Sequence, residues 1–152
     1  MQGLRSEYLF TLTGEVGPPQ SVGDTPIGPR LIVPVLGGHF EGPRLRGNVL
    51  PGGTDWITIR SDGSFHLDVR ITLETDDNHL VGMTYRGLRH ASPEVMKRLT
   101  AGEPVEPSEY YFRVVPTFEA GPGPYEWMNR IIAVAVGDRR PTGPIYEVHQ
   151  IL

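Results

Sequence analysis

The chain has 152 residues, enough for one domain that buries a sizeable core, so a single domain over residues 1–152 is expected. Its formal net charge of −4 comes without a long run of either sign, which disfavours nucleic acid as a partner. The absence of cysteine excludes disulfides, thiol catalysis and cysteine metal sites.

Alternation of apolar and polar residues with a period of two predicts β-strands along most of the chain. In Glu7–Val16, for example, Tyr8, Phe10 and Leu12 share one face. About nine strands are predicted, at Glu7–Val16, Arg30–Val35, Arg44–Leu50, Trp56–Arg60, Ser64–Glu74, Leu80–Gly87, Glu109–Glu119, Glu126–Gly137 and Ile145–Leu152.

Short polar turns separate several of these strands. Ser61-Asp62-Gly63 predicts a hairpin because Asp-Gly tolerates positive φ, and Asp76-Asp77-Asn78 is a second turn signal. The glycine-rich stretch Gly37–Trp56 predicts sharp turns and bulges within a β framework.

One helix is predicted near Pro93–Leu99. Ser92 suits the N-cap, Pro93 the first helical position, and Gly102 the end. Many strands in one small domain predict a sandwich or a closed antiparallel barrel. The barrel is preferred, because several strands carry polar and small residues on one face, as a ligand-holding lumen needs.

Three strands carry candidate binding residues. In Ser64–Glu74, Arg70 belongs to a polar face that either lines a lumen or is wet, the common antiparallel pattern. Arg113, in an aromatic strand beside Tyr111, is either a lumen cation suited to an oxyanion or a surface arginine whose head reaches water.

In the third strand, large aromatic residues give way to small ones along one face. Tyr125, Trp127 and Asn129 are followed there by Ala133 and Ala135, a taper that fits a cavity floor. Ordinary core packing, with Asn129 bonded to a neighbouring loop, is the alternative. Either interpretation fits the sequence.

Asp55 lies where a glycine turn enters a strand, next to Trp56. A carboxyl group shielded from water has a raised pKa and is suited to shuttle protons. The alternative is a turn residue that bonds nearby backbone.

Other classes of site lack support in the sequence. The five histidines form no tight metal-ligand pair, and no nucleophile elbow or phosphate-binding loop occurs, so neither metal nor cofactor is expected. The start MQGLRSEYLF lacks the apolar centre of a signal peptide, and the longest apolar run, Ile131–Val136, is far short of the ~20 residues that span a bilayer. A cytoplasmic protein that does not enter membranes is expected.

Four segments together resemble the domain-of-unknown-function family 3237, an uncharacterised protein family. They are GGHFEGPRLRGNVLPGGTDW, LDVRITLET, the triplet YFR and PYEWMNRIIAVAVG. The resemblance runs from about Tyr8 to Val148 and implies an antiparallel, calycin-like β-barrel that binds small cyclic ligands of aromatic or polyketide metabolism. The signature residues that it implies here are Asp55, Trp56, Arg70, Gly87, Tyr111, Arg113, Tyr125, Trp127 and Asn129.

The hypothesis favoured by these residues is a lyase, isomerase or cyclase acting on a small carbonyl or carboxylate compound. Asp55 is expected to move the proton, Arg113 and Arg70 to hold an oxyanion, and Tyr111 to act as an acid or second donor. Trp56, Tyr125, Trp127 and Asn129 are expected to bind substrate. A lipocalin-like carrier is the alternative, an interaction module is a third class, and homodimerisation is left open.

Overall fold

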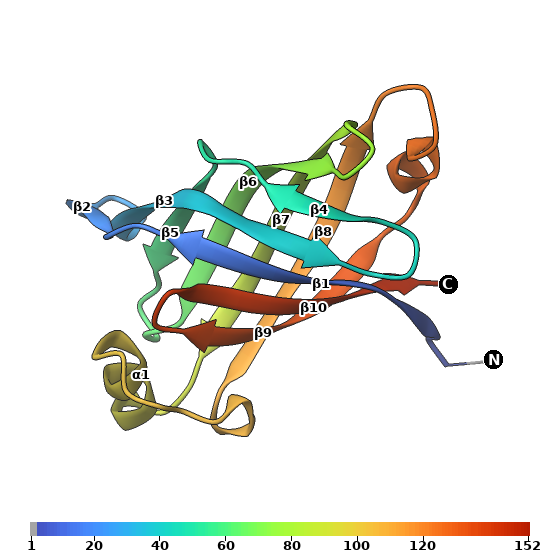
Figure 1. Ribbon diagram of the computed structural model, residues 1–152. Coiled ribbons are helices and arrows are strands. Elements are labelled where there is room, and N and C mark those ends of the chain that lie inside the picture. Colours follow the sequence, from blue (N-terminus) through green and yellow to red (C-terminus); the bar gives the residue numbers. More distant parts are fainter. Residues whose placement is uncertain (1–2) are drawn as a thin grey trace.

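The computed structural model describes residues 3–152, which form a ten-stranded antiparallel sheet that closes into a barrel, with one α-helix and two short 3-10 helices (Figure 1). The elements are β1 (Ser6–Val16), β2 (Gln20–Thr25), β3 (Gly28–Glu41), β4 (Arg46–Val49), β5 (Thr54–Ile59), β6 (Phe65–Thr75), β7 (Leu80–His90), α1 (Pro93–Thr100), η1 (Pro107–Glu109), β8 (Tyr111–Ala120), η2 (Glu126–Arg130), β9 (Ala133–Arg140) and β10 (Gly143–Ile151). The predicted antiparallel barrel is confirmed.

Pairing between the first and third strands closes the barrel. The sheet runs in the order β1-β10-β9-β8-β7-β6-β4-β3-β2, and β1 pairs again with β3, with Leu12 opposite Phe40. Both β4 and β5 bridge β3 and β6, while β2 pairs with β3 outside the ring. One long strand, β3, therefore contacts four others.

A glycine in Gly37–Trp56, the stretch predicted to contain turns and bulges, permits the close pairing of β3 with β1. Gly38 has φ +140°, and a Cβ there would lie 2.2 Å from the carbonyl oxygen of Thr13, so only glycine lets β3 approach β1 this closely. The hairpin turn at Asp62-Gly63 also forms, with Gly63 at φ +84°.

The helix forms where its caps predict. Pro93 begins α1, and the Ser92 hydroxyl accepts a hydrogen bond from the Val95 N–H at 3.3 Å. The predicted strand Glu126–Gly137 is wrong in its first part, because η2 occupies Glu126–Arg130 and the strand begins at Ala133. The period-two interpretation of Tyr125, Trp127 and Asn129 therefore fails: no strand exists there to alternate.

The two ends of the barrel are filled differently. At the end covered by η2, Phe10 packs on Phe40 and Phe118 at ring distances of 5.5 and 6.1 Å, and Met128 of η2 is fully buried. At the end near α1, smaller wall residues such as Val33 and Val35 leave a space that the core does not fill. We call these the closed end and the open end.

Candidate functional site

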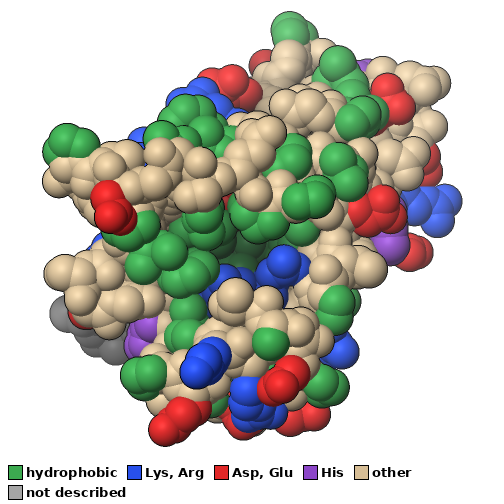
Figure 2. Space-filling model, turned by 90° about the vertical axis from the view of Figure 1, so that its left-hand side faces the viewer, with side chains coloured by type: hydrophobic (Ala, Val, Ile, Leu, Met, Phe, Trp, Pro, Cys, Tyr) green, Lys and Arg blue, Asp and Glu red, His purple; other side chains and the backbone are tan. Residues whose placement is uncertain are grey.

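The open end leads into a cavity of about 190 Å³ (Figure 2). Its wall is mostly apolar, and Figure 2 shows hydrophobic side chains around the hollow with Lys or Arg atoms at its edge. Its chemically active lining consists of Asp55, Tyr85, Arg89, Arg139 and Tyr146. Apolar walls with a few convergent polar groups are typical of small-molecule sites.

Asp55 points inward because of its register in β5. It lies opposite Val33 of β3 and Val69 of β6, both buried. Burial raises the pKa of its carboxyl group from 3.8 to about 7, against the opposing effects of the Asp68 N–H and the Arg89 charge. That N–H donates to Asp55 Oδ1 over a long 3.4 Å. Asp55 is therefore poised to accept or give a proton near neutral pH.

Arg89 is a buried cation at the end of β7, with 8% of its surface exposed. Its guanidinium carbon lies 4.9 Å from the Phe65 ring centre and 5.7 Å from that of Phe112, which fixes its position by cation–π contact. Its buried Nε has no hydrogen-bond partner. Burial, and then the charge of Arg139, lowers the pKa of Arg89, which as an arginine keeps its charge.

Arg139 of β9 is the second cavity cation and is only partly buried. Its N–H donates to the Tyr110 hydroxyl at 2.7 Å, and that hydroxyl donates to Asp138 Oδ1 at 3.1 Å, so the backbone at this point is held. Its side chain donates from Nη1 to the Arg140 carbonyl. Burial lowers the pKa of Arg139 as well.

Two tyrosines form the polar inner surface beyond these charges. The rings of Tyr85 and Tyr146 meet edge to face at 5.2 Å, and Phe112 packs on Tyr146 at 5.3 Å. Burial raises the pKa of both hydroxyls above their usual range. Both therefore stay protonated at neutral pH and serve as neutral hydrogen-bond donors.

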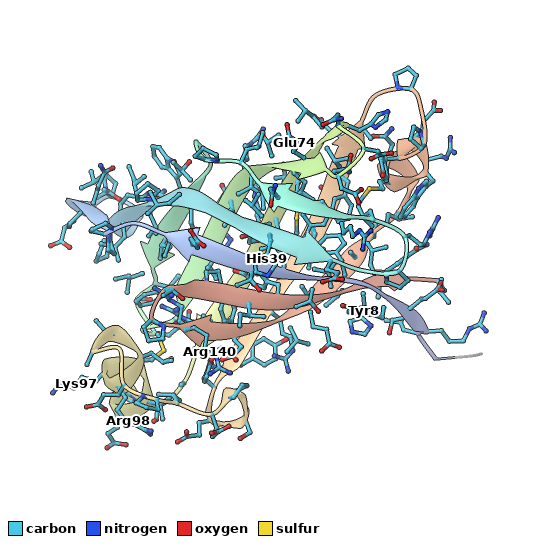
Figure 3. The ribbon with its side chains drawn as sticks, in the orientation of Figure 1. Tyr8, His39, Glu74, Lys97, Arg98 and Arg140 are labelled. Atoms are coloured by element: carbon cyan, nitrogen blue, oxygen red, sulfur yellow. The ribbon has the colours of Figure 1, made fainter. Side chains whose placement is uncertain are left out.

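Helix α1 reaches the cavity through Leu99 and Thr100. A second hollow beside it, running from Leu99 to Glu103, is lined across by Arg139, Arg140 and Pro141. Figure 3 shows Arg98 on α1 and Arg140 at the end of β9 on the same side of the barrel. The two hollows share Leu99, Thr100 and Arg139, so the cavity mouth includes α1 and the end of β9.

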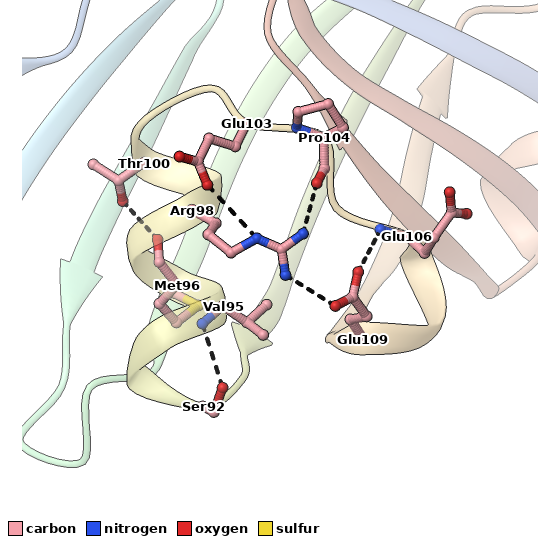
Figure 4. A network of polar contacts seen from close by, with 9 residues as sticks. All are labelled: Ser92, Val95, Met96, Arg98, Thr100, Glu103, Pro104, Glu106 and Glu109. Carbon is pink, nitrogen blue, oxygen red and sulfur yellow. Dashed lines mark hydrogen bonds and ion pairs between the residues drawn. The ribbon is translucent and has the colours of Figure 1, made fainter.

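A polar network holds α1 in this place (Figure 4). Arg98 donates to Glu109 Oε1 at 3.0 Å and to the Pro104 carbonyl at 2.8 Å, and its Nε lies 3.6 Å from Glu103 Oε2. Glu109 also accepts from the Glu106 N–H at 2.9 Å. Arg98 therefore ties the helix to the following loop and to η1.

Of the residues predicted to form the site, the structure brings Asp55 to the cavity and leaves four others on the outer wall. Arg70 and Trp56 border a shallow outer hollow, and Tyr111 is 47% exposed, stacked on His90. Arg113 lies over the Tyr111 ring at 4.9 Å and donates to the Phe112 carbonyl. The expectation that Arg70 and Arg113 face a shared lumen is wrong, because the more apolar parity of β6 and β8 points inward.

The other three predicted residues lie at the closed end. The Tyr125 hydroxyl donates to Asp77 Oδ1 at 2.7 Å, and Arg44 stacks on Trp127 with its guanidinium carbon 3.5 Å from the ring centre. The Asn129 side chain exchanges two 2.8 Å hydrogen bonds with the backbone of Ala120. These contacts seal the barrel, so the expectation that these residues bind substrate in the same cavity as Asp55 is corrected.

The residues that the sequence reasoning missed are Arg89, Arg139 and the two tyrosines. The predicted strand ended at Gly87, but the inward alternation of Val81 and Tyr85 continues to Arg89. The face with Ala133 and Ala135 likewise continues to Arg139. The inward alternation, followed to the true end of each strand, identifies both arginines as cavity residues.

Two further properties concern the described part of the chain. Residues 3–152 contain no group of three or more His, Asp or Glu side chains arranged to hold a metal ion. None of the helices in this range is long and apolar enough to cross a membrane.

Comparison with known proteins agrees with the fold. A UPF0311 protein from Bradyrhizobium diazoefficiens is 38% identical over 149 residues, covering 98% of this chain and 97% of that protein. The crystal structure of a protein of unknown function from Rhodopseudomonas palustris is 36% identical, with a TM-score of 0.93 over 100% of this chain and 99% of that one.

A more distant structure is described as an enzyme from Penicillium herquei. It is 21% identical, with a TM-score of 0.76 over 100% of this chain and 97% of that chain, a likeness that shows the fold. The family model described as protein of unknown function (DUF3237) matches residues 4–151. The chain therefore belongs to the DUF3237 family of β-barrel proteins.

Proposed function

We propose that the protein is an enzyme that moves a proton on a small carbonyl compound bound in the barrel, in the class of lyases, isomerases and cyclases. The observation that carries this proposal is Asp55, a carboxyl group with a pKa of about 7 in an apolar cavity that also holds two arginines. A base of this pKa suits proton transfer at neutral pH. The Penicillium herquei structure, described as an enzyme, is consistent with catalysis on this fold.

The chemistry follows from the cavity residues alone. The Asp55 carboxylate takes a proton from the carbon beside the carbonyl, and the C–H electron pair moves into a C=C bond as the carbonyl oxygen gains the negative charge. Arg89, whose charge lowers the pKa of Asp55 more than that of Arg139 does, stabilises that oxygen. A tyrosine hydroxyl donates a hydrogen bond to it.

The enolate formed by this proton transfer can react in three ways. Return of the proton from Asp55 to a different carbon is an isomerisation, departure of a group from the β-carbon is an elimination, and attack on a second electrophilic atom of the substrate is a cyclisation. The aromatic lining, Phe65, Phe112, Tyr85 and Tyr146, suits a ring-bearing substrate of aromatic or polyketide-like character.

A carrier is the second candidate, and the largely apolar wall favours it. A carrier uses Arg89 and Arg139 only to hold its ligand and has no need of a titrating carboxyl group. The two candidates therefore differ in the effect of removing the Asp55 carboxyl group. An enzyme loses turnover, whereas a carrier still binds its ligand.

The test is hydrogen exchange from carbon in D₂O, followed by NMR with phenylpyruvate and phenylacetone as enolisable probes. The native protein is expected to accelerate exchange beside the carbonyl, and Asp55→Asn to reduce that acceleration by ~10²–10⁴. Asp68→Asn is the matched control: the Asp68 side chain lies on the outer wall, 3.5 Å from Arg86, and its backbone N–H is unchanged. Exchange at the uncatalysed rate with both probes, or equal loss in both variants, contradicts the proposal.

A further inference from the structure

Arg89 and Arg139 differ from the other arginines because they line the cavity. Four arginines on the surface have a carboxylate within ion-pair reach, namely Arg46–Asp76 at 2.9 Å, Arg86–Asp68 at 3.5 Å, Arg98–Glu109 at 3.0 Å and Arg140–Asp138 at 2.7 Å. Other exposed arginines, such as Arg44, Arg60 and Arg70, have no carboxylate partner in the described part of the chain and are open to water. Within residues 3–152, no carboxylate oxygen comes within 4.0 Å of Arg89 or Arg139.

The cavity therefore carries an excess of positive charge. Asp55 is the one carboxyl group in its lining, and it faces two guanidinium groups. Removing a cation from water without an anionic partner is costly, and buried arginines are usually paired for this reason. An unpaired cation in a ligand cavity indicates that the ligand brings the anion.

The two cations differ in position. Arg89 is held by the rings of Phe65 and Phe112, and its charge has the larger influence on Asp55. The charge of Arg139 lowers the pKa of Asp55 less than that of Arg89 does, and Arg139 lines both the cavity and the second hollow at the mouth. Arg89 therefore suits the reacting oxygen beside Asp55, and Arg139 suits a second group nearer the entrance.

We propose that the substrate is an organic acid whose permanent carboxylate binds to Arg139 at the cavity mouth, while its ring lies in the apolar interior. This inference rests on the proposed function for the role of Arg89, but the carboxylate site itself is a matter of binding. The planar guanidinium group matches a carboxylate through two parallel hydrogen bonds. A cavity of about 190 Å³ admits one substituted ring.

The probes are 3-phenylpropionate and its neutral isostere 3-phenylpropanamide, which differ by charge and hardly in shape. Calorimetric titration of the native protein is expected to give at least about tenfold tighter binding of the acid. Arg139→Met is expected to lower the affinity for the acid to that for the amide, and Arg139→Lys, which keeps the charge and loses the fork, to retain part of the preference.

Arg46→Met is the matched control, because Arg46 is an exposed arginine outside the cavity lining and its charge is paired with Asp76 at 2.9 Å. It is expected to change the affinity for the acid by no more than about twofold. Thermal unfolding of each variant checks that it is folded, and Arg139→Lys carries the test where Arg139→Met does not fold.

Equal affinity of the native protein for acid and amide, no detectable binding of the acid, or equal loss in the Arg139 and Arg46 variants overturns the proposal. These outcomes are separate from those of the proton-transfer test. Exchange with phenylacetone but no preference for acids leaves the function and removes the carboxylate site. Preference for acids without any exchange leaves the site and favours a carrier.

Discussion

The two ends of the barrel are made by the same strands but differ in how side chains fill the interior. At the closed end, Phe10, Phe40 and Met128 fill the interior, and Tyr125 and Asn129 are hydrogen-bonded to Asp77 and Ala120. At the open end, smaller residues leave a cavity in which Arg89 and Arg139 lack a carboxylate partner. We propose from this difference that the closed end serves stability and the open end serves ligand binding, a division that variants at the two ends can test.

The largest effect is expected from cavity creation at the closed end. Phe10→Ala is expected to lower the free energy of unfolding by about 3–5 kcal/mol, since the ring is fully buried against Phe40 and Phe118. Urea denaturation measures this. A matched pair sharpens the result: Val81→Ala, fully buried, is expected to cost more than Val33→Ala, whose side chain borders an existing space. Equal costs at Val81 and Val33 contradict the division.

The next effect concerns pH. The folded protein holds the Asp55 proton up to about pH 7, whereas the unfolded chain releases it near 3.8. Between these values the folded state binds more protons, so the contribution of Asp55 to stability falls as pH rises through this window and is constant above it. The unfolding free energy of the native protein minus that of Asp55→Asn is therefore expected to fall steadily from pH 4 to pH 7, so that the native protein loses stability relative to the variant. A difference that stays flat over this range counts against a buried Asp55.

A smaller gain is expected from removing an unpaired charge at the open end. Arg89→Met keeps an apolar stem against Phe65 and Phe112 and removes a buried cation whose Nε has no partner. Without ligand, the free energy of unfolding is expected to rise by about 1–2 kcal/mol. Arg86→Met, on the outer side of the same strand, is expected to change it by less than about 0.5 kcal/mol. Destabilisation by Arg89→Met shows that Arg89 is a structural residue.

The smallest change in stability is expected at α1. Arg98→Met removes exposed contacts to Glu103, Pro104 and Glu109, so global stability is expected to change by less than about 1 kcal/mol. Amide hydrogen exchange in residues 93–106 is expected to accelerate all the same, because Arg98 ties this segment together. Lys97→Met, an exposed neighbour on the same helix, is the control. Unchanged exchange in both variants means that other contacts hold α1.

Much of the fold was accessible from the sequence because it depends on local patterns. Period-two alternation located most strands, and Ser92 with Pro93 located α1. The strand predicted at Glu126–Gly137 failed in its first part because a 3-10 turn can also place aromatic residues at alternating positions. The η2 helix depends on contacts such as that of Asn129 with Ala120, which no local pattern contains.

The site was harder to predict from the sequence, because the packing of the whole barrel decides which face of each strand points into the lumen. The neighbours of Asp55 left it open between a proton shuttle and a turn residue, and the family resemblance favoured the site, whereas Arg70 and Arg113 were assigned to the wrong face. Arg89 and Arg139 lie at strand ends, where alternation is hardest to extend, and they meet Asp55 only through the closure of the barrel. Chemistry assembled from four or five strands is a property of register, which single-strand patterns do not determine.

The open end differs from the closed end above all in Asp55, a carboxyl group with a pKa of about 7. The most direct measurement is the titration of the Asp55 side-chain carbonyl by ¹³C NMR of protein labelled at aspartate, with Asp55→Asn identifying the signal. The structure predicts a midpoint near pH 7. A midpoint near the usual aspartate value of about 4 means that water reaches Asp55 freely, and it contradicts the account.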